Sequence, residues 1–398
     1  MSEFRELFEK AAGYAADYRD AVSGKPSSPH VTYEDILARA SVAVPETGIA
    51  ADAIIDELAA LSKDALMPIT GPRFFAWVMG SSHPASVAAD FLVAAWGQNT
   101  AFHGPTPLTS AVEAVAERWL LDLLDLPRES AIGFSTGATV ANGICLAAAR
   151  TGTLNRVGWD PDADGLFGAP PVHVLIGADA HSSLYSSLQL IGFGSRRLTK
   201  IATDDQGRML PSALEAAIAK LSGPKIVIAQ AGQINTGCFD PFTEIAAITK
   251  AHDAWLHVDG AFGLWARATG SRRHLTEGIE LADSWCTDGH KWLQMSYDCG
   301  FAIVRDRDAL AKAMTQWSTY LPSLQQPALL MLHPDDAEIV RAGIGHELDK
   351  SGWRIVEDAQ LERGGCRVDT ASNQIDAQIA SRWQRLTASL NADVDWLA

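Results

Sequence analysis

A lysine, Lys291, carries the most distinctive chemistry that this sequence offers. It lies in the segment DSWCTDGHKWL (283–293), between His290 and Trp292, directly after a short run that predicts a strand. Partial burial at the end of a strand favours a neutral amine, which is the form that attacks an aldehyde. The segment therefore indicates Schiff-base chemistry, with an ordinary surface lysine at a strand end as the alternative.

Two further polar side chains also follow apolar runs. Asp259 ends such a run in LHVDGAFG (256–263), and His181 follows another in GADAHSSL (177–184). Ligands of α/β sheets bind at the carboxyl ends of the strands, where a carboxylate can pair with a protonated ring nitrogen. The alternatives are an aspartate that only caps a loop and a histidine with a structural role.

A glycine-rich turn supplies the fourth signal. In GFSTGATVANG (133–143), small residues lead into a helix that begins at about Ala138. The first turn of a helix offers free N–H donors and a positive dipole end, which together hold a phosphate. Such turns are common, so this segment indicates a phosphate site only in combination with the other three segments.

The sheet that would position these side chains is indicated by short β-branched runs between alanine-rich helices. Strands are predicted at 172–177, 225–231, 255–261, 283–287 and 300–304. Helices are predicted at 138–150, 182–190, 212–220 and 241–251 and, nearer the N-terminus, at 1–22, 51–67, 86–96 and 110–124. This alternation predicts an α/β domain whose mostly parallel sheet is covered on both faces.

Changes of pattern divide the chain into three parts. Residues 1–70 are predicted to be a helical segment, 71–325 the large domain with the sheet, and 328–398 a small α/β domain. The composition changes at SLQQPALL (323–330), which places a boundary near residue 325.

Charge and cysteine usage argue against several classes of protein. The net charge of −16 disfavours nucleic acid as a partner. Five cysteines without a C-x-x-C pair indicate reduced thiols, and no metal site is predicted. The charged first twenty residues do not form a signal peptide, and no apolar window predicts membrane insertion, so a cytoplasmic location is expected.

The four segments, in this order and spacing, resemble the pyridoxal-dependent decarboxylase family, which includes the aromatic-amino-acid and glutamate decarboxylases. Two further stretches, 71–99 and 231–242, are similar to the family's substrate-side and cofactor-side segments. The resemblance covers residues 50–322. It implies a large domain of the PLP-dependent transferase-like type (fold type I), with pyridoxal 5'-phosphate as the cofactor.

The resemblance also implies a role for each matching residue. Lys291 would form the Schiff base with the cofactor, Asp259 would pair with its pyridine nitrogen, and His181 would stack on its ring and orient the departing carboxylate. Ala138 and Thr139 would hold the phosphate at the helix start.

Three more residues take roles from the same resemblance. His290 would lie near the phosphate. Asn235 matches a position near the cofactor ring where the family often has threonine. Tyr320, in STYLP, matches a tyrosine on a mobile loop that returns a proton to the substrate carbon after CO2 leaves.

The implied activity is decarboxylation of an L-amino acid to an amine and CO2 by a homodimer, in which the partner subunit completes the active site. The same core residues would also serve transamination or aldol-type cleavage, so these reactions are the alternative. Nothing in the sequence names the amino acid.

The last part of the chain resembles a different family. Residues 332–390 are similar to the C-terminal domain of flagellar and type III secretion stator proteins of the FliH type, with the motifs HPDD, W-R-I-V-x-D, E-R-G-G-C-R-V and D-A-x-I-x-x-R-W in order. This implies an export ATPase as a possible partner of 328–398. It also implies a decarboxylase that lacks its small C-terminal domain, joined to the stator-like part near 322–328. A third reading is therefore a catalytically impaired fusion that acts as an export-ATPase adaptor.

Overall fold

The computed structural model divides the chain into two units, Met1–Thr315 and Gln316–Ala398. It describes residues 3–43, 46–100, 106–314, 328–350, 352–370, 374–378, 380–381 and 384. The boundary predicted near residue 325 therefore lies outside the described residues.

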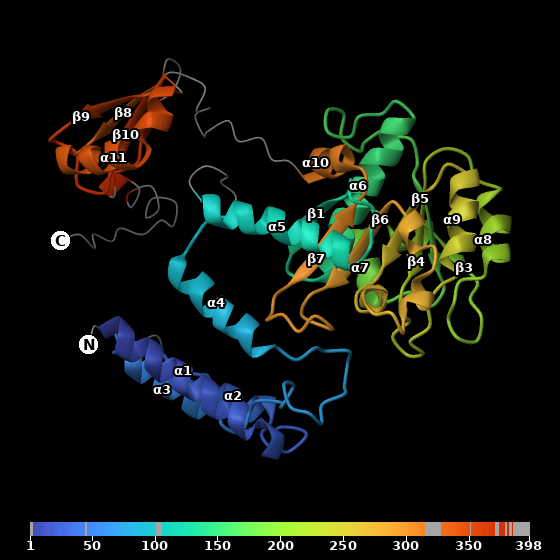
Figure 1. The fold of residues 1–398 in the computed structure, drawn as a ribbon, viewed down its shortest axis with the longest axis horizontal. Coiled ribbons are helices and arrows are strands. Elements are labelled where there is room, and N and C mark those ends of the chain that lie inside the picture. Colours follow the sequence, from blue (N-terminus) through green and yellow to red (C-terminus); the bar gives the residue numbers. More distant parts are fainter. Residues whose placement is uncertain are drawn as a thin grey trace. The chain divides into compact units, whose positions relative to one another are not determined.

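A seven-stranded sheet forms the centre of the first unit, with the strand order β1-β7-β6-β5-β4-β2-β3 (Figure 1). Its strands are β1 (Ala131–Ser135), β2 (His173–Gly177), β3 (Leu198–Ile201), β4 (Lys225–Gln230), β5 (Trp255–Asp259), β6 (Ser284–Asp288) and β7 (Gly300–Val304). Only β7 is antiparallel to its neighbours, which confirms the predicted mostly parallel α/β sheet.

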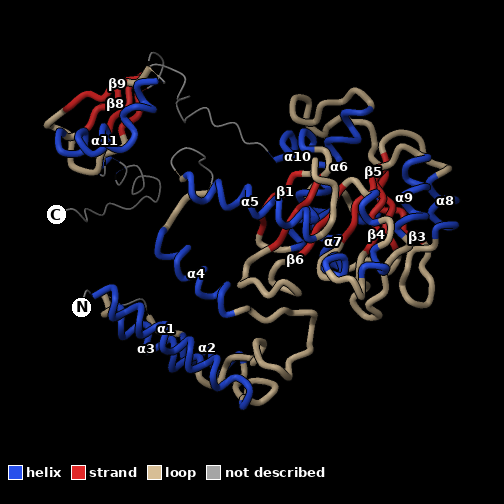
Figure 2. The backbone as a smooth tube through the Cα atoms, in the orientation of Figure 1, coloured by secondary structure: helices blue, strands red, loops and turns tan. Residues whose placement is uncertain are grey.

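Helices cover both faces of this sheet, as Figure 2 shows. They are α6 (Ala138–Arg156), α7 (Ser182–Leu190), α8 (Pro211–Ile218), α9 (Phe242–Ala251) and α10 (Arg307–Met314). Alternate residues of β4 serve the two cores: Val227 and Ala229 pack with α8 and α9, whereas Ile226 and Ile228 pack with α6 and α7. A strand buried on both faces must be apolar throughout, which is why these runs were visible in the sequence.

Five helices precede the sheet: α1 (Glu3–Ala21), α2 (Tyr33–Ala40), α3 (Ala51–Ser62), α4 (Pro84–Trp96) and α5 (Pro107–Leu123). Helices α1 and α3 are joined through Asp56, which accepts hydrogen bonds from Lys10 Nζ and Tyr14 Oη, both at 2.8 Å. Short 3-10 helices complete the unit at Val22–Gly24, Ser195–Arg197, Gly263–Ala268, Arg273–Thr276 and Ile279–Leu281. No helix in the described part of the chain is long and apolar enough to cross a membrane.

The second unit has its own four-stranded sheet, in the order β11-β10-β8-β9. Its elements are β8 (Ala328–Leu332), α11 (Pro334–Lys350), β9 (Arg354–Glu357), β10 (Cys366–Thr370) and β11 (Gln374–Asp376). Trp353, Leu348 and Val368 form its small core. The chain turns at Gly364, which has a φ of 78°, and its N–H donates to Asp336 at the start of α11. The described residues of this unit thus have the α/β character expected for the last part of the chain.

Candidate active site

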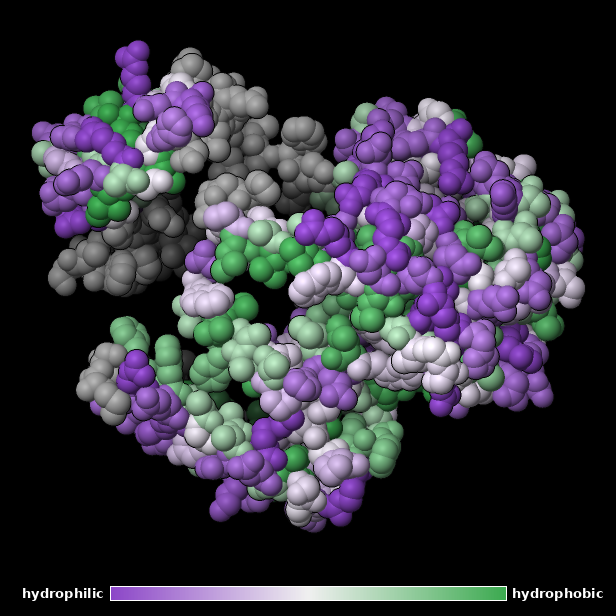
Figure 3. Space-filling model, in the orientation of Figure 1, coloured by the Kyte–Doolittle hydropathy of each residue, from purple (hydrophilic) through white to green (hydrophobic). Residues whose placement is uncertain are grey.

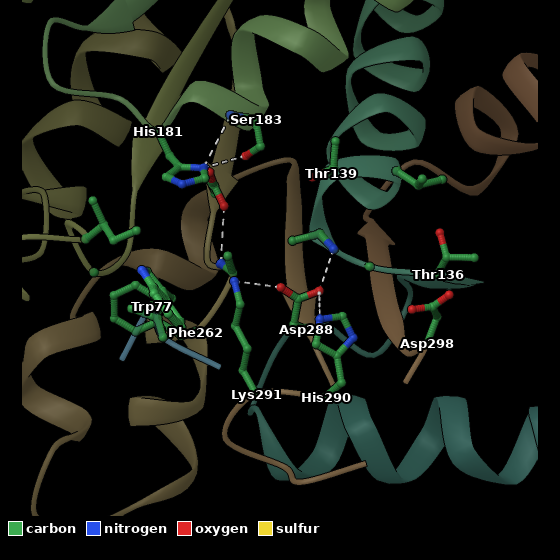
Figure 4. Close-up of a pocket in the computed structure, with 18 of the residues that line it drawn as sticks. Trp77, Thr136, Thr139, His181, Ser183, Phe262, Asp288, His290, Lys291 and Asp298 are labelled. Carbon is green, nitrogen blue, oxygen red and sulfur yellow. Dashed lines mark hydrogen bonds and ion pairs between the residues drawn. The ribbon is translucent and has the colours of Figure 1, made fainter. Parts of the chain in front are cut away.

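A cavity of about 430 Å³ lies at the carboxyl ends of the parallel strands (Figure 4). Asp259 and Asp288, the last residues of β5 and β6, reach it from the sheet, while Ala138 and His181 reach it from the starts of α6 and α7. Lys291 completes the set from the turn after β6. The predicted strand-end residues are thus brought together in one place.

Lys291 forms an ion pair with Asp288, with Nζ 2.8 Å from Oδ2. A carboxylate therefore stands directly beside the amine that the sequence analysis assigned to Schiff-base chemistry, within reach of a proton on Nζ.

Asp288 also occupies the start of α6. Its Oδ1 accepts the N–H of Ala138 at 2.5 Å, and the residue is buried. An anion at this position is stabilised by the free N–H groups and the dipole of the helix. The sequence analysis missed Asp288, although an acidic residue at a strand end, three positions before the lysine, was the available signal.

The turn before α6 is packed so closely that side chains are excluded. A Cβ on Gly300 would lie 2.5 Å from Gly137 Cα, and one on Gly137 would lie 3.1 Å from His290 Cε1. The ring of His290 stacks on Tyr297, with centroids 4.3 Å apart, and its Nδ1 accepts the N–H of Cys299. Its Nε2 lies 3.5 Å from Asp288 Oδ1, so His290 borders the same anion position.

His181 is held by the helix that it begins. Its Nδ1 lies 2.7 Å from Ser183 Oγ and accepts the N–H of Ser183, which caps α7. The backbone N–H of His181 donates to Gln230 Oε1 at the end of β4. Ser183 therefore orients the imidazole, Gln230 holds the backbone, and the ring lines the cavity.

Asp259 is almost fully buried, with 3% of its surface exposed. Its Oδ1 accepts the N–H of Ala261 at 3.2 Å and lies 3.4 Å from the thiol of Cys286. A buried carboxylate that lines a cavity is well placed to pair with a cationic group on a ligand.

The N-terminal segment forms the remaining wall. Trp77 and Val78 line the cavity with φ values of 56° and 54°, a left-handed conformation that is costly for such side chains. A Cβ on Gly80 would lie 2.2 Å from Lys291 O, so this segment lies directly against the lysine turn. The sequence identified the segment by resemblance but did not indicate these contacts.

One predicted residue, Asn235, does not line the cavity, and another lies outside the part of the chain that the structure describes. Asn235 is exposed and its N–H donates to Gln233 Oε1, whereas the neighbouring Ile234 lines the cavity. Tyr320 lies outside the described residues. Thr139, by contrast, lines the cavity at the start of α6, as predicted.

The family described as "Pyridoxal-dependent decarboxylase conserved domain" matches residues 34–329, well over half of the chain. The chain belongs to this family. A second match, "Flagellar assembly protein FliH", covers residues 300–386 and overlaps the first only at 300–329. Both resemblances found in the sequence are thereby confirmed.

Individual relatives support the same family. An aromatic-L-amino-acid decarboxylase of Bacillus atrophaeus is 27% identical over 323 residues, covering 80% of this chain and 65% of the relative. An L-2,4-diaminobutyrate decarboxylase of Rhizobium meliloti is 32% identical over 271 residues, covering 66% of this chain and 52% of the relative. The chain thus spans between about half and two thirds of the length of these relatives.

Solved structures agree with the fold. The chain superposes on Oryza sativa TDC, solved with PLP and tryptamine, with a TM-score of 0.73 and 25% identity, covering 81% of this chain and 67% of that one. Mouse CSAD has a similar fold, with a TM-score of 0.72, 22% identity and coverage of 80% and 68%. The predicted fold class is confirmed.

The residues of the cavity fit pyridoxal phosphate, the predicted cofactor of this family. The start of α6 already holds an anionic group, the carboxylate of Asp288, at the position expected for a phosphate. The amine of Lys291 and the buried carboxylate of Asp259 line the same cavity. These are the three kinds of group that an aldehyde, a pyridine nitrogen and a phosphate require.

Proposed function

We propose that this chain uses pyridoxal phosphate to remove the carboxyl group of an L-amino acid, giving an amine and CO2, and that Lys291 carries the cofactor. The observation that supports this most directly is the single cavity that collects Lys291, Asp259, His181 and the start of α6. An enzyme that removes a carboxyl group in this way is a carboxy-lyase, which agrees with the family to which the chain belongs.

When bound, the cofactor supplies an electron sink for the electron pair that remains on the substrate carbon when CO2 leaves. Asp259 would hold a proton on the ring nitrogen and so maintain that sink. His181 would lie against the ring and orient the substrate carboxylate. Ala138 and Thr139, with His290 beside them, would hold the phosphate at the start of α6.

Proton movements fall to residues around the lysine. Asp288 Oδ2, 2.8 Å from Lys291 Nζ, is close enough to take the proton that the amine must lose. Tyr320 would return a proton to the substrate carbon, which distinguishes decarboxylation from transamination. Asn235 is proposed only as a neighbour of the ring, and Ile234 is the better placed of the two in this conformation.

The first test is the absorbance spectrum of the purified chain with added pyridoxal phosphate, before and after borohydride. Pyridoxal phosphate also forms Schiff bases with surface lysines. Lys250→Ala, at the exposed end of α9, is therefore the matched control for Lys291→Ala. We expect a visible band that borohydride removes in the wild type and in Lys250→Ala, with no such band in Lys291→Ala. A band of equal size in all three proteins would overturn the assignment of Lys291.

The substrate and the reaction are tested separately with a panel of aromatic, acidic and diamino acids. The relatives named above act on amino acids of different kinds, so none of them identifies the substrate. Formation of an amine with an equal amount of CO2 supports decarboxylation. Formation of a keto acid would instead indicate transamination, which the names of the relatives do not favour.

A second function is proposed for residues 328–398, on the basis of the FliH match: binding to an export ATPase. The test is capture of a purified flagellar export ATPase by the full chain, compared with a chain that ends after Thr315. Capture by the full chain alone supports an adaptor role. Equal capture by both chains, or none, removes it.

A further inference from the structure

Asp259 belongs to a hydrogen-bonded network that extends away from the cavity into the sheet. Cys286 is its direct partner on the neighbouring strand, since Asp259 in β5 and Cys286 in β6 are paired in register. The Cys286 thiol lies 3.4 Å from Asp259 Oδ1 and 3.1 Å from Asn142 Oδ1. All three residues are buried.

The Cys286 thiol is protonated and has one S–H to donate. Complete burial, reinforced by the nearby charge of Asp259, raises the pKa of the Cys286 thiol well above its usual value. The thiol therefore keeps its proton at neutral pH. One S–H faces two acceptors, and the rest of the network decides between them.

The other acceptor, Asn142 Oδ1, receives a hydrogen bond from His257. Burial lowers the pKa of His257 to about 3, so its ring is neutral and has one N–H. Nε2 lies 2.8 Å from Asn142 Oδ1 and therefore carries the proton, while Nδ1, 2.9 Å from Ser284 Oγ, accepts the Ser284 hydroxyl. The indole N–H of Trp255 donates to the same Ser284 oxygen.

The thiol proton is thus left for the carboxylate. Asn142 Oδ1 already accepts the His257 N–H, and a charged carboxylate is a stronger acceptor than an amide oxygen. Asn142 Nδ2 has no hydrogen-bond partner among the described residues.

We propose that Cys286 is a positioning residue for Asp259. Its thiol proton and the N–H of Ala261 hold Oδ1 in place, which turns Oδ2 toward the cavity and the ring nitrogen of the cofactor. His257 and Asn142 support this arrangement by releasing the thiol from its competing acceptor. The inference rests on the proposed function, because it concerns the carboxylate that would pair with the cofactor ring.

Three variants of the full chain test it. Cys286→Ala removes the donor, Cys286→Ser keeps one, and Cys145→Ala is the matched control. Cys145 is equally buried in the same core, but its thiol faces the backbone oxygens of Trp285 and Ile303. The measurements are the dissociation constant of pyridoxal phosphate by absorbance titration and the pH dependence of the visible band. That band reports protonation of the Schiff-base nitrogen, which in turn responds to the charge on the cofactor ring.

We expect Cys286→Ala to weaken cofactor binding about three- to tenfold, as for one lost hydrogen bond, and to shift the pH dependence of the band. Cys286→Ser and Cys145→Ala should remain within about threefold of the wild type on the same scale. If Cys286→Ala binds and titrates like Cys145→Ala, the positioning role is wrong while the proposed function stands. If the wild type forms no band at all, both proposals fail.

Discussion

At the scale of single residues, Asp288 has two partners that a bound cofactor would also need. Its carboxylate holds the start of α6 through Ala138 and the amine of Lys291. A phosphate at the same helix start would meet this negative charge at close range. Asp288 would thus compete with a phosphate for the start of α6 and, in the proposed function, would accept the proton of Lys291.

The variant Asp288→Asn should separate these effects. We expect pyridoxal phosphate to bind about five- to tenfold more tightly, because a competing charge is removed, while an oxygen remains for the Ala138 N–H. Turnover should fall, because Lys291 loses its proton acceptor. Asp298→Asn, at another carboxylate that lines the cavity, is the control. Weaker binding by Asp288→Asn would contradict the argument.

Asp240 provides a pH-dependent prediction outside the chemical steps. Burial raises its pKa to about 6, although it accepts the N–H groups of Met209 and Gln230, each at 2.7 Å. Because the folded value exceeds the unfolded one, this residue's stabilising contribution is complete at low pH and is lost as pH rises through 6. The free energy of unfolding of the wild type, relative to Asp240→Asn, should fall by about 1 kcal/mol between pH 5 and pH 7. Urea unfolding at both pH values measures it, and parallel profiles would refute it.

At the scale of elements, strand position decided what could be predicted. β4, β5 and β6 are buried on both faces and contain β-branched or aromatic residues, so their runs were found. β1 and β3 were missed: β1 contains a central glycine and is half exposed, and β3 is a short edge strand that contains Lys200. The local pattern of such strands does not differ from that of a loop.

The site divides in the same way. Residues at strand ends could be found because the parallel sheet itself brings them together. The wall at Trp77 and Val78 depends on contacts across most of the chain, which no local pattern encodes. Asn235 follows from the family resemblance, whereas in the structure the turn between Gly232 and Gly237, both at positive φ, places Ile234 in the cavity wall.

The glycines at the start of α6 make a prediction at this scale. In Gly300→Ala, the new Cβ would meet the backbone of Gly137 at 2.5 Å, so the turn must open and cofactor affinity should fall more than about tenfold. Gly143→Ala, within α6, is the control, since a Cβ there would meet no atom within 4 Å. That change should stabilise the helix by up to about 1 kcal/mol. Cofactor titration and thermal unfolding of both variants would measure these effects.

At the scale of the whole molecule, the first unit exposes a large apolar surface on α4 and α5, visible as green in Figure 3. On α5 it comprises Leu108, Val112, Trp119 and Leu123, which lie on one face of the helix. Surfaces of this size usually mark an interface. A second copy of the chain is the expected partner, in line with the homodimer that the sequence predicted.

Trp119, 71% exposed, is the residue to change in order to test this. We expect the wild type to sediment as a dimer and Trp119→Glu to shift to monomer, since a charge in an apolar interface is costly. Phe167→Glu is the control, because Phe167 is fully exposed and belongs to the loop between α6 and β2 rather than to α4 or α5. A dimer that survives Trp119→Glu but dissociates in Phe167→Glu would place the interface elsewhere.

The close fit between Gly80 and Lys291 has a consequence for the order in which the protein matures. A neighbouring contact, from Ser86 Oγ to Gln294 O, joins residues 208 positions apart. Closing so long a loop costs more entropy than forming local contacts, so such contacts tend to form late. During synthesis the segment at Gly80 leaves the ribosome long before the lysine exists, and the two can meet only after the sheet between them has been made. A newly made chain would therefore acquire its cofactor site as one of its last steps, after most of its sheet is already protected from hydrogen exchange.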